Sequence, residues 1–126
     1  MTIEHIAIWT RDIEAMKNFY LKFFDLNSNE KYYNPKKQFS SYFLSFKNGA
    51  RIELMHRPDV SEILNTTPLG FAHFAISVGS RENVDVLTEK IRESGHKIVG
   101  EPRTTGDGYY ESVIEDLEGN LIEITI

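Results

Sequence analysis

The alternation of apolar and polar residues predicts a strand followed by a helix at the start of the chain. β-Branched and aromatic residues make 2–10 a strand, and Asp12 is placed to cap the next helix. Apolar residues then recur at helical spacing and form one buried stripe: Ile13, Met16, Tyr20 and Phe23. Shorter alternating runs predict three further strands, at 30–34, 39–46 and 50–56. The first half of the chain is therefore expected to form a β-α-β-β-β unit.

The second half repeats this order of elements. Residues 71–78 form its first predicted strand, Ser80 caps its helix, and Gly95 stands where a left-handed residue commonly ends a helix. The buried stripe of this helix is predicted to contain Val84, Leu87 and Ile91, and the later strands are expected at 97–103, 109–115 and 120–126. Turn residues at 48–49 and 118–120 precede the last strand of each half, as in hairpins.

Two pairs of matching segments indicate that the halves are an internal repeat. Residues 5–8 (HIAI) recur as 73–76 (HFAI), 68 positions later, and the glycine and glutamate of 49–53 recur 70 positions later. We therefore expect one domain, 1–126, built of two modules at about 1–57 and 70–126, which are joined by a linker at 58–69.

Side-chain alternation places four polar residues on one face of the predicted sheets. In the first and last strands of each module, one face is apolar, with Ile6, Ile8, Ile52, Leu54, Phe74, Ile76, Ile122 and Ile124. The opposite face carries His5, Glu53, His73 and Glu123. We expect the apolar faces to pack under the helices and the second face to surround a cavity.

The four polar residues have both a structural and a functional interpretation. A single strand histidine is commonly a hydrogen-bonded core residue, and Arg51 is available as an ion-pair partner for Glu53. Together, however, imidazoles and carboxylates are common ligands of divalent ions. Burying two carboxylates close together without a cation would lower the stability of the fold by several kcal/mol. The joint pattern predicts a metal site.

Composition and charge narrow the range of functions. Fourteen basic and nineteen acidic residues give a net charge of −5, which disfavours nucleic acid as a partner. The absence of cysteine excludes disulfides and thiolate metal sites, and no apolar run is long enough for a membrane span. Without a signal-peptide pattern, the expected location is the cytoplasm. Ten of the fifteen aromatic residues lie within 19–46, where most should build the core and a minority line a ligand pocket.

At these residues the chain resembles the vicinal oxygen chelate superfamily, which includes glyoxalase I, bleomycin-resistance proteins and extradiol dioxygenases. The resemblance rests on an ordered set of motifs: HIAI before a helix, G-x-x-x-E-L, GFAHFAIS and DLEGNLIEI. It implies an α+β fold in which two β-α-β-β-β modules form an eight-stranded incomplete barrel round a metal. Because many short members complete the site across two chains, it favours a homodimer, with completion of the site within one chain as the alternative.

The order His, Glu, His, Glu is that of glyoxalase I-like members of the superfamily. It implies that His5, Glu53, His73 and Glu123 bind one divalent ion, which can be Ni, Zn, Co, Mn or Fe. The implied activity is that of a lyase or isomerase acting on a small α-oxygenated substrate, a 2-oxo compound or hemithioacetal, through a metal-stabilised enediolate. Glu123 matches the catalytic base, with Glu53 as its near-symmetric partner.

Three further residues are candidate substrate contacts: Trp9, Arg103 and Tyr109. Arg103 lies in a turn-rich segment, 100–110, that is either a cover for the pocket or an ordinary hairpin. An alternative function is non-catalytic binding of a planar compound, as in bleomycin-resistance proteins, although these members generally lack the ligands. Extradiol cleavage of a catechol is a weaker alternative, because that class uses two histidines and one glutamate.

Overall fold

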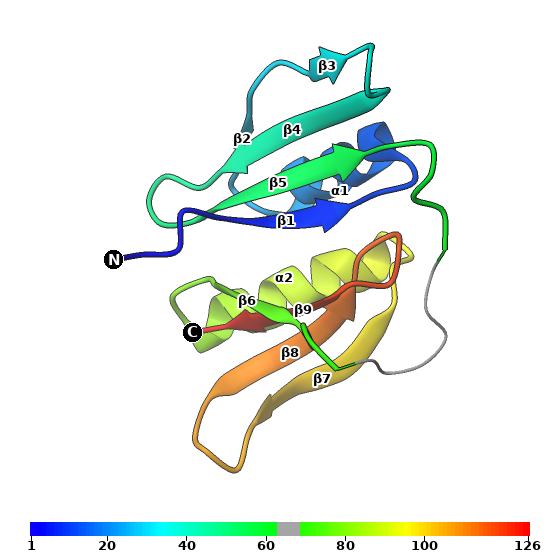
Figure 1. The fold of residues 1–126 in the computed structure, drawn as a ribbon. Helices are drawn as coiled ribbons and strands as arrows, with labels where there is room; N and C mark the ends of the chain where they lie inside the picture. The colour runs from blue at the N-terminus through cyan, green and yellow to red at the C-terminus, as the bar shows by residue number, and fades with distance from the viewer. Residues whose placement is uncertain (63–68) are drawn as a thin grey trace. The chain divides into compact units, whose positions relative to one another are not determined.

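The computed structural model describes residues 1–62 and 69–126, and the chain divides into two compact units, Met1–Ile63 and Leu64–Ile126 (Figure 1). Unit 1 contains β1 (His5–Trp9), α1 (Ile13–Phe23), β2 (Asn27–Ser28), β3 (Tyr32–Asn34), β4 (Phe39–Ser45) and β5 (Arg51–His56). Unit 2 contains β6 (Phe74–Ser77), α2 (Arg81–Glu93), β7 (Ile98–Thr104), β8 (Tyr110–Glu115) and β9 (Leu121–Thr125). The predicted α+β class with two modules is confirmed.

The two units have the same sheet topology. In unit 1 the strand order is β1-β5-β4-β2, with β3 also paired to β4, and in unit 2 it is β6-β9-β8-β7. In each unit the first and last strands are parallel neighbours, and the other pairs are antiparallel. This arrangement places the strand that begins at His5 beside the strand that contains Glu53, and β6 beside the strand that contains Glu123. Part of the predicted linker, 63–68, lies outside the described residues.

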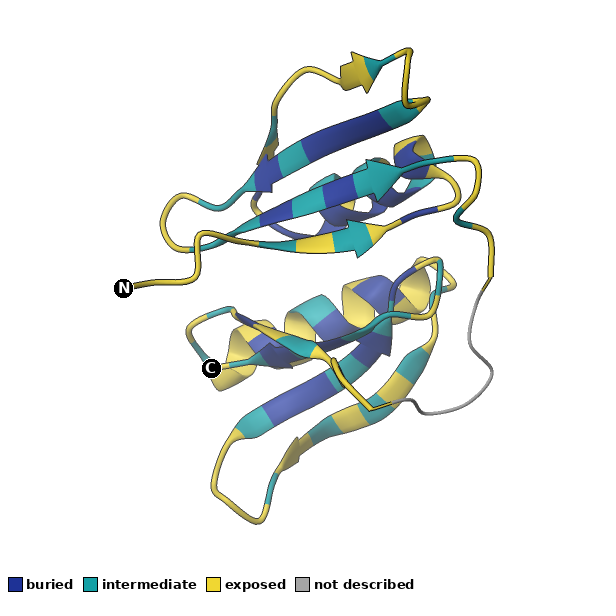
Figure 2. Cartoon of the chain, in the orientation of Figure 1, coloured by how far each residue is buried: buried dark blue, intermediate teal, exposed yellow. Residues whose placement is uncertain are grey.

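The apolar stripe of α1 forms the core of unit 1, as the helical spacing predicts. Asp12 caps the helix by accepting a hydrogen bond from the Ala15 backbone N–H at 3.0 Å. The buried helix residues are Ile13, Met16, Phe19, Tyr20 and Phe23, and the sheet contributes Leu44, Ile52 and Leu54 (Figure 2). The β5 residues on the opposite face of the sheet, Arg51, Glu53 and Met55, are half-buried.

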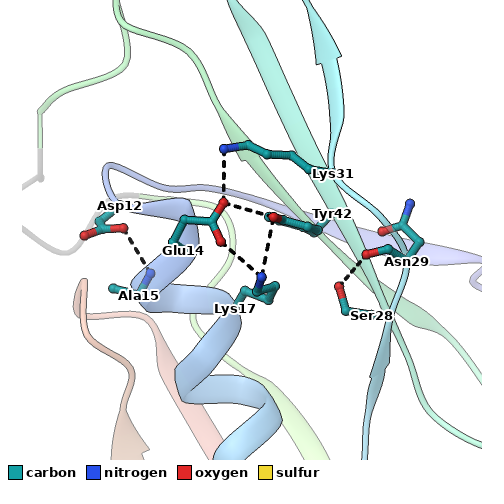
Figure 3. Close-up of polar contacts among 8 residues, drawn as sticks. All are labelled: Asp12, Glu14, Ala15, Lys17, Ser28, Asn29, Lys31 and Tyr42. Carbon is teal, nitrogen blue, oxygen red and sulfur yellow. Dashed lines mark hydrogen bonds and ion pairs between the residues drawn. The ribbon is translucent and has the colours of Figure 1, made fainter.

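A network of hydrogen bonds and ion pairs connects α1 to the sheet of unit 1 (Figure 3). The Glu14 carboxylate accepts hydrogen bonds from Lys17 at 3.0 Å, from Lys31 at 3.1 Å and from the Tyr42 hydroxyl at 2.9 Å. The Lys17 ammonium also lies 4.4 Å from the centre of the Tyr42 ring. These contacts, above all the bond from Lys17, lower the pKa of Glu14 to about 2.

Helix α2 buries a polar residue that the apolar spacing did not predict. Its buried residues are Val84, Thr88 and Ile91, whereas Leu87, expected in the stripe, is only half-buried. Thr88 is tolerated there because its hydroxyl donates to the Val84 carbonyl and shares a 2.6 Å hydrogen bond with the hydroxyl of Ser112 on β8. The predicted cap and end of this helix are confirmed: Ser80 accepts from the Asn83 N–H, and Gly95 has φ +81°.

Three predicted strands differ from the observed ones. The strand expected at 2–10 spans only His5–Trp9. The strand expected at 30–34 spans only Tyr32–Asn34 (β3), and the preceding strand β2 (Asn27–Ser28) was not predicted. Between the two strands, the side chain of Asn29 accepts the backbone N–H of Phe43 on β4 at 2.7 Å. This side-chain bond replaces a strand-to-strand bond and interrupts the ladder. The strand expected at 71–78 spans only Phe74–Ser77, so His73 directly precedes β6. No helix within 1–62 or 69–126 is long and apolar enough to cross a membrane.

Candidate functional site

In unit 1, the parallel pairing of β1 and β5 brings His5 and Glu53 together. Glu53 lies opposite Ala7 in the strand register, and His5 is two residues before Ala7 on the same face. The His5 Nε2 atom lies 3.7 Å from a Glu53 carboxylate oxygen. The imidazole is 38% exposed and the carboxylate side chain 16%, so the pair is open on the histidine side.

The second nitrogen of the His5 ring has its own partner. Its Nδ1 atom lies 2.5 Å from a carboxylate oxygen of Glu4, whose other oxygen pairs with the guanidinium of Arg51. Arg51 therefore pairs with Glu4, although the sequence suggested Glu53. The hydrogen bond with His5, followed by the contacts with Arg51, lowers the pKa of Glu4. Sequence reasoning missed Glu4, whose only signal was its position beside a candidate ligand.

In unit 2, His73 and Glu123 form the corresponding pair. Glu123 lies opposite Ala75 in the register of β6 and β9, and the His73 Nε2 atom is 3.2 Å from a Glu123 carboxylate oxygen. The imidazole is 42% exposed and the glutamate side chain 20%. The two units thus carry the same donor pair, with the glutamate on the last strand and the histidine at the start of the first strand in unit 1 and directly before it in unit 2.

The turn before β9 fixes the start of the strand that carries Glu123. The buried carboxylate of Asp116 accepts the backbone N–H groups of Glu118 and Asn120, each at 2.9 Å, and the Asn120 side-chain amide at 2.8 Å. The glycine and asparagine at 119–120 predicted this turn, whereas no role was predicted for Asp116. An aspartate two residues before such a turn was the available signal.

The donor atoms of each pair are suited to a divalent ion. Two ligands at about 2.1 Å from a cation, separated by an angle of about 90–110°, stand about 3.0–3.4 Å apart. The separation of 3.2 Å in unit 2 lies within this range, and the separation of 3.7 Å in unit 1 lies slightly above it. Within 1–62 and 69–126, no set of three or more His, Asp and Glu side chains is gathered as a metal-holding group. The four-ligand site therefore stays a prediction.

The three candidate substrate contacts lie in different surroundings. Trp9 is 41% exposed at the end of β1, and Tyr109 is 56% exposed in the turn between β7 and β8. Arg103 lies within β7, where its guanidinium contacts the carboxylate of Glu111 at 3.4 Å. Segment 100–110 is thus mostly strand: its turn is confined to 105–109, and Thr105 accepts the Tyr109 N–H at 3.1 Å. The roles of these residues in substrate binding stay predictions.

Comparison with known proteins places this chain among relatives of one fold. A family model described as the Glyoxalase/Bleomycin resistance protein/Dioxygenase superfamily matches residues 2–124. Glyoxalase I from Zea mays is similar with a TM-score of 0.83 and 25% identity, over 98% of this chain and 44% of its own. A glyoxylase/bleomycin resistance protein/dioxygenase domain from Frankia sp. EAN1pec is similar with a TM-score of 0.85 and 17% identity, over 100% of this chain and 97% of its own.

A further solved structure is the trypanothione-dependent glyoxalase I of Leishmania major, with a TM-score of 0.80 and 20% identity, over 99% of this chain and 86% of its own. This chain therefore spans less than half the length of the maize enzyme but nearly the whole of the Frankia domain. Comparison by sequence finds no match among curated proteins. With a family model that matches nearly all of its residues, the chain belongs to the Glyoxalase/Bleomycin resistance protein/Dioxygenase superfamily.

Proposed function

We propose that this protein is a metal-dependent lyase or isomerase of the glyoxalase I type, acting on a small α-oxygenated substrate such as a hemithioacetal or another 2-oxo compound. The observation that carries the proposal is the repeated pair, in which a histidine Nε2 lies beside a glutamate oxygen on the sheet face opposite the buried aliphatic side chains of each unit. Membership of the superfamily and similarity to glyoxalase I structures support the same reaction class.

The two pairs, His5 with Glu53 and His73 with Glu123, would hold one divalent ion, drawn from Ni, Zn, Co, Mn and Fe. When bound, such an ion supplies Lewis-acid stabilisation of the negative charge that develops on a substrate oxygen. Two imidazoles and two carboxylates leave room for two substrate oxygens in an octahedral set. We therefore expect substrates with oxygens on adjacent carbon atoms.

Glu123 is proposed as the base that takes the proton from the carbon next to the carbonyl and returns it to the neighbouring carbon. Its side chain is 20% exposed, so the carboxylate is largely shielded from water but is still accessible beside the more exposed His73. Glu53, with the equivalent place in unit 1, is its near-symmetric partner. The remaining proposed features are a cytoplasmic homodimer and substrate contacts from Trp9, Arg103 and Tyr109.

The decisive experiment measures metal content and turnover together. The protein is loaded with Ni, Co or Zn and assayed with hemithioacetals that methylglyoxal forms with a panel of thiols. We expect turnover that requires the ion and falls strongly in Glu123→Gln. Glu115→Gln is the matched control, because Glu115 lies on the adjacent strand but pairs with Lys97 at 2.7 Å. Loss of turnover in both variants, or in neither, would contradict the role of Glu123.

A second candidate function is the sequestration of a planar compound without turnover. The observation that favours it is an exposed aromatic row at one end of the unit 1 sheet, where the Phe39 ring lies 6.3 Å from Trp9 and 6.2 Å from Tyr32. Because Trp9 is the only tryptophan, its fluorescence reports binding at this row directly. Quenching by planar compounds in metal-free protein, combined with no turnover on any 2-oxo substrate, would favour this function over the enzyme.

A further inference from the structure

We propose that Glu4 is a positioning residue for His5, which fixes the ring so that its Nε2 atom is free to bind a cation beside Glu53. This inference rests on the proposed function, because it assigns a role toward the metal ion. It also predicts a property of the metal-free protein, which can be measured whether or not the enzyme proposal holds.

The two nitrogens of the His5 ring face different carboxylates. The Nδ1 atom lies 2.5 Å from Glu4, while the Nε2 atom lies 3.7 Å from Glu53. A neutral imidazole carries one proton, and the shorter contact identifies Nδ1–H as the donor to Glu4. The lone pair of Nε2 then points to the side of Glu53. Carboxylates that accept the second N–H of a metal-binding histidine set its tautomer and strengthen its binding.

Glu4 is itself held from two directions across the β1–β5 pair. Arg51 forms an ion pair with the Glu4 carboxylate, and its backbone N–H donates to the Glu4 carbonyl oxygen at 2.9 Å. The Arg51 guanidinium lies 4.0 Å from the centre of the Phe43 ring, and the same ring meets His5 edge-on at 5.4 Å. Phe43 thus contacts both ends of the Arg51–Glu4–His5 series. The orientation of Glu4 is therefore supported although its side chain is 63% exposed.

Unit 2 lacks the chemical groups of this support. The residue before His73 is Ala72, and the positions that correspond to Arg51 and Phe43 by the 70-residue spacing hold Leu121 and Val113. None of these side chains can accept a proton from an imidazole or hold a carboxylate. The two histidines therefore differ in how their rings are oriented. The ring of His5 is held by the carboxylate of the preceding residue, and His73 has no carboxylate at that position.

The tautomer is tested first in metal-free protein, at a pH chosen from the ¹⁵N spectra so that the His5 ring carries a single proton. Long-range ¹⁵N–¹H NMR spectra, with the His5 signals assigned by His5→Gln, show which ring nitrogen carries the proton. We expect the Nδ1–H form at His5 in the wild type, a shift toward the Nε2–H form in Glu4→Ala, and recovery of the Nδ1–H form in Glu4→Asp. An unchanged tautomer in Glu4→Ala would overturn the proposal.

Metal affinity is tested next, by calorimetric titration of the intact protein with Zn²⁺ and with Co²⁺. We expect affinity to fall about tenfold in Glu4→Ala, as is usual when the partner of a metal-binding histidine is removed. Asp59→Asn is the matched control, because it removes an exposed carboxylate that also pairs with an arginine, Arg57, in the same unit. An equal loss in both variants would overturn the positioning role, because the effect would then come from net charge.

The two measurements separate this inference from the proposed function. If the wild type binds neither ion but its His5 tautomer responds to Glu4→Ala, the enzyme proposal fails and the role of Glu4 in setting the ring is retained. If the ions bind with equal affinity in the wild type and in Glu4→Ala, the enzyme proposal is unaffected and the role of Glu4 is overturned.

Discussion

The network around Glu14 predicts that the protein loses stability as the pH falls from 4.5 toward 2. Lys17, Lys31 and the Tyr42 hydroxyl contact this carboxylate, and the Lys17 bond contributes most to lowering its pKa from 4.5 to about 2. A carboxyl group whose pKa is lower in the folded state adds stability above its unfolded pKa. That stability is lost as the pH falls through the folded pKa.

The magnitude follows from the shift and from the exposure of the side chain. A change in pKa from 4.5 to about 2 corresponds to at most about 3.4 kcal/mol, at about 1.36 kcal/mol per unit. The Glu14 side chain is 49% exposed, so water and salt screen its contacts with the two lysines. Exposed ion pairs measured singly contribute up to about 1 kcal/mol, and we expect about 1 kcal/mol for this network.

Urea unfolding, followed by Trp9 fluorescence, measures this contribution in the wild type and in Glu14→Gln. At pH 7 we expect the variant to be less stable by about 1 kcal/mol, and by about pH 3 more than half of that difference should be gone. Glu30→Gln is the control, because it removes the same charge at an exposed position of unit 1. A variant as stable as the wild type at pH 7, or a difference that is equal at both pH values, would refute the reasoning.

The candidate site and the core of unit 2 predict three further outcomes. Glu123→Gln should lower the turnover of a hemithioacetal substrate at least about 100-fold while the protein keeps its fold, as steady-state kinetics and circular dichroism would show; unchanged turnover would reject the assignment. Removal of divalent ions with a chelator should lower the melting temperature of the wild type in scanning calorimetry and leave that of His73→Ala unchanged. Thr88→Val should lower the free energy of unfolding by about 1–2 kcal/mol in urea, because it leaves the buried Ser112 hydroxyl without its 2.6 Å partner. The double variant Thr88→Val with Ser112→Ala should recover part of this loss.

Strand alternation was sufficient to predict the sheet face on which each candidate ligand lies. The period of two is strict in a strand with one buried face, so the burial of Ile52 and Leu54 fixes the face on which Glu53 lies. In the same way, the burial of Ile122 and Ile124 fixes the opposite face of β9 as the one on which Glu123 lies. The repeat then predicts that His5 and His73, and Glu53 and Glu123, occupy corresponding positions.

Details below the level of strand faces could not be predicted in this way. Alternation gives the face of His5 but not which ring nitrogen meets Glu4, because that depends on side-chain rotamers and on the placement of Arg51. Hydrophobic spacing favoured Leu87 over Thr88, since a buried hydroxyl is acceptable only where the fold supplies a partner such as Ser112. A four-ligand site would also require contacts between distant segments, which local spacing does not determine.

The parallel pairing of first and last strands makes each donor pair a contact between distant parts of the chain. His5 and Glu53 are separated by 48 positions, and His73 and Glu123 by 50, so neither pair exists until the intervening helix and strands have closed the loop. A nascent or partly unfolded chain therefore lacks these adjacent donors. A cation that binds through such a pair would stabilise the folded unit and not the unfolded chain. Cation binding would therefore follow folding and would not guide it.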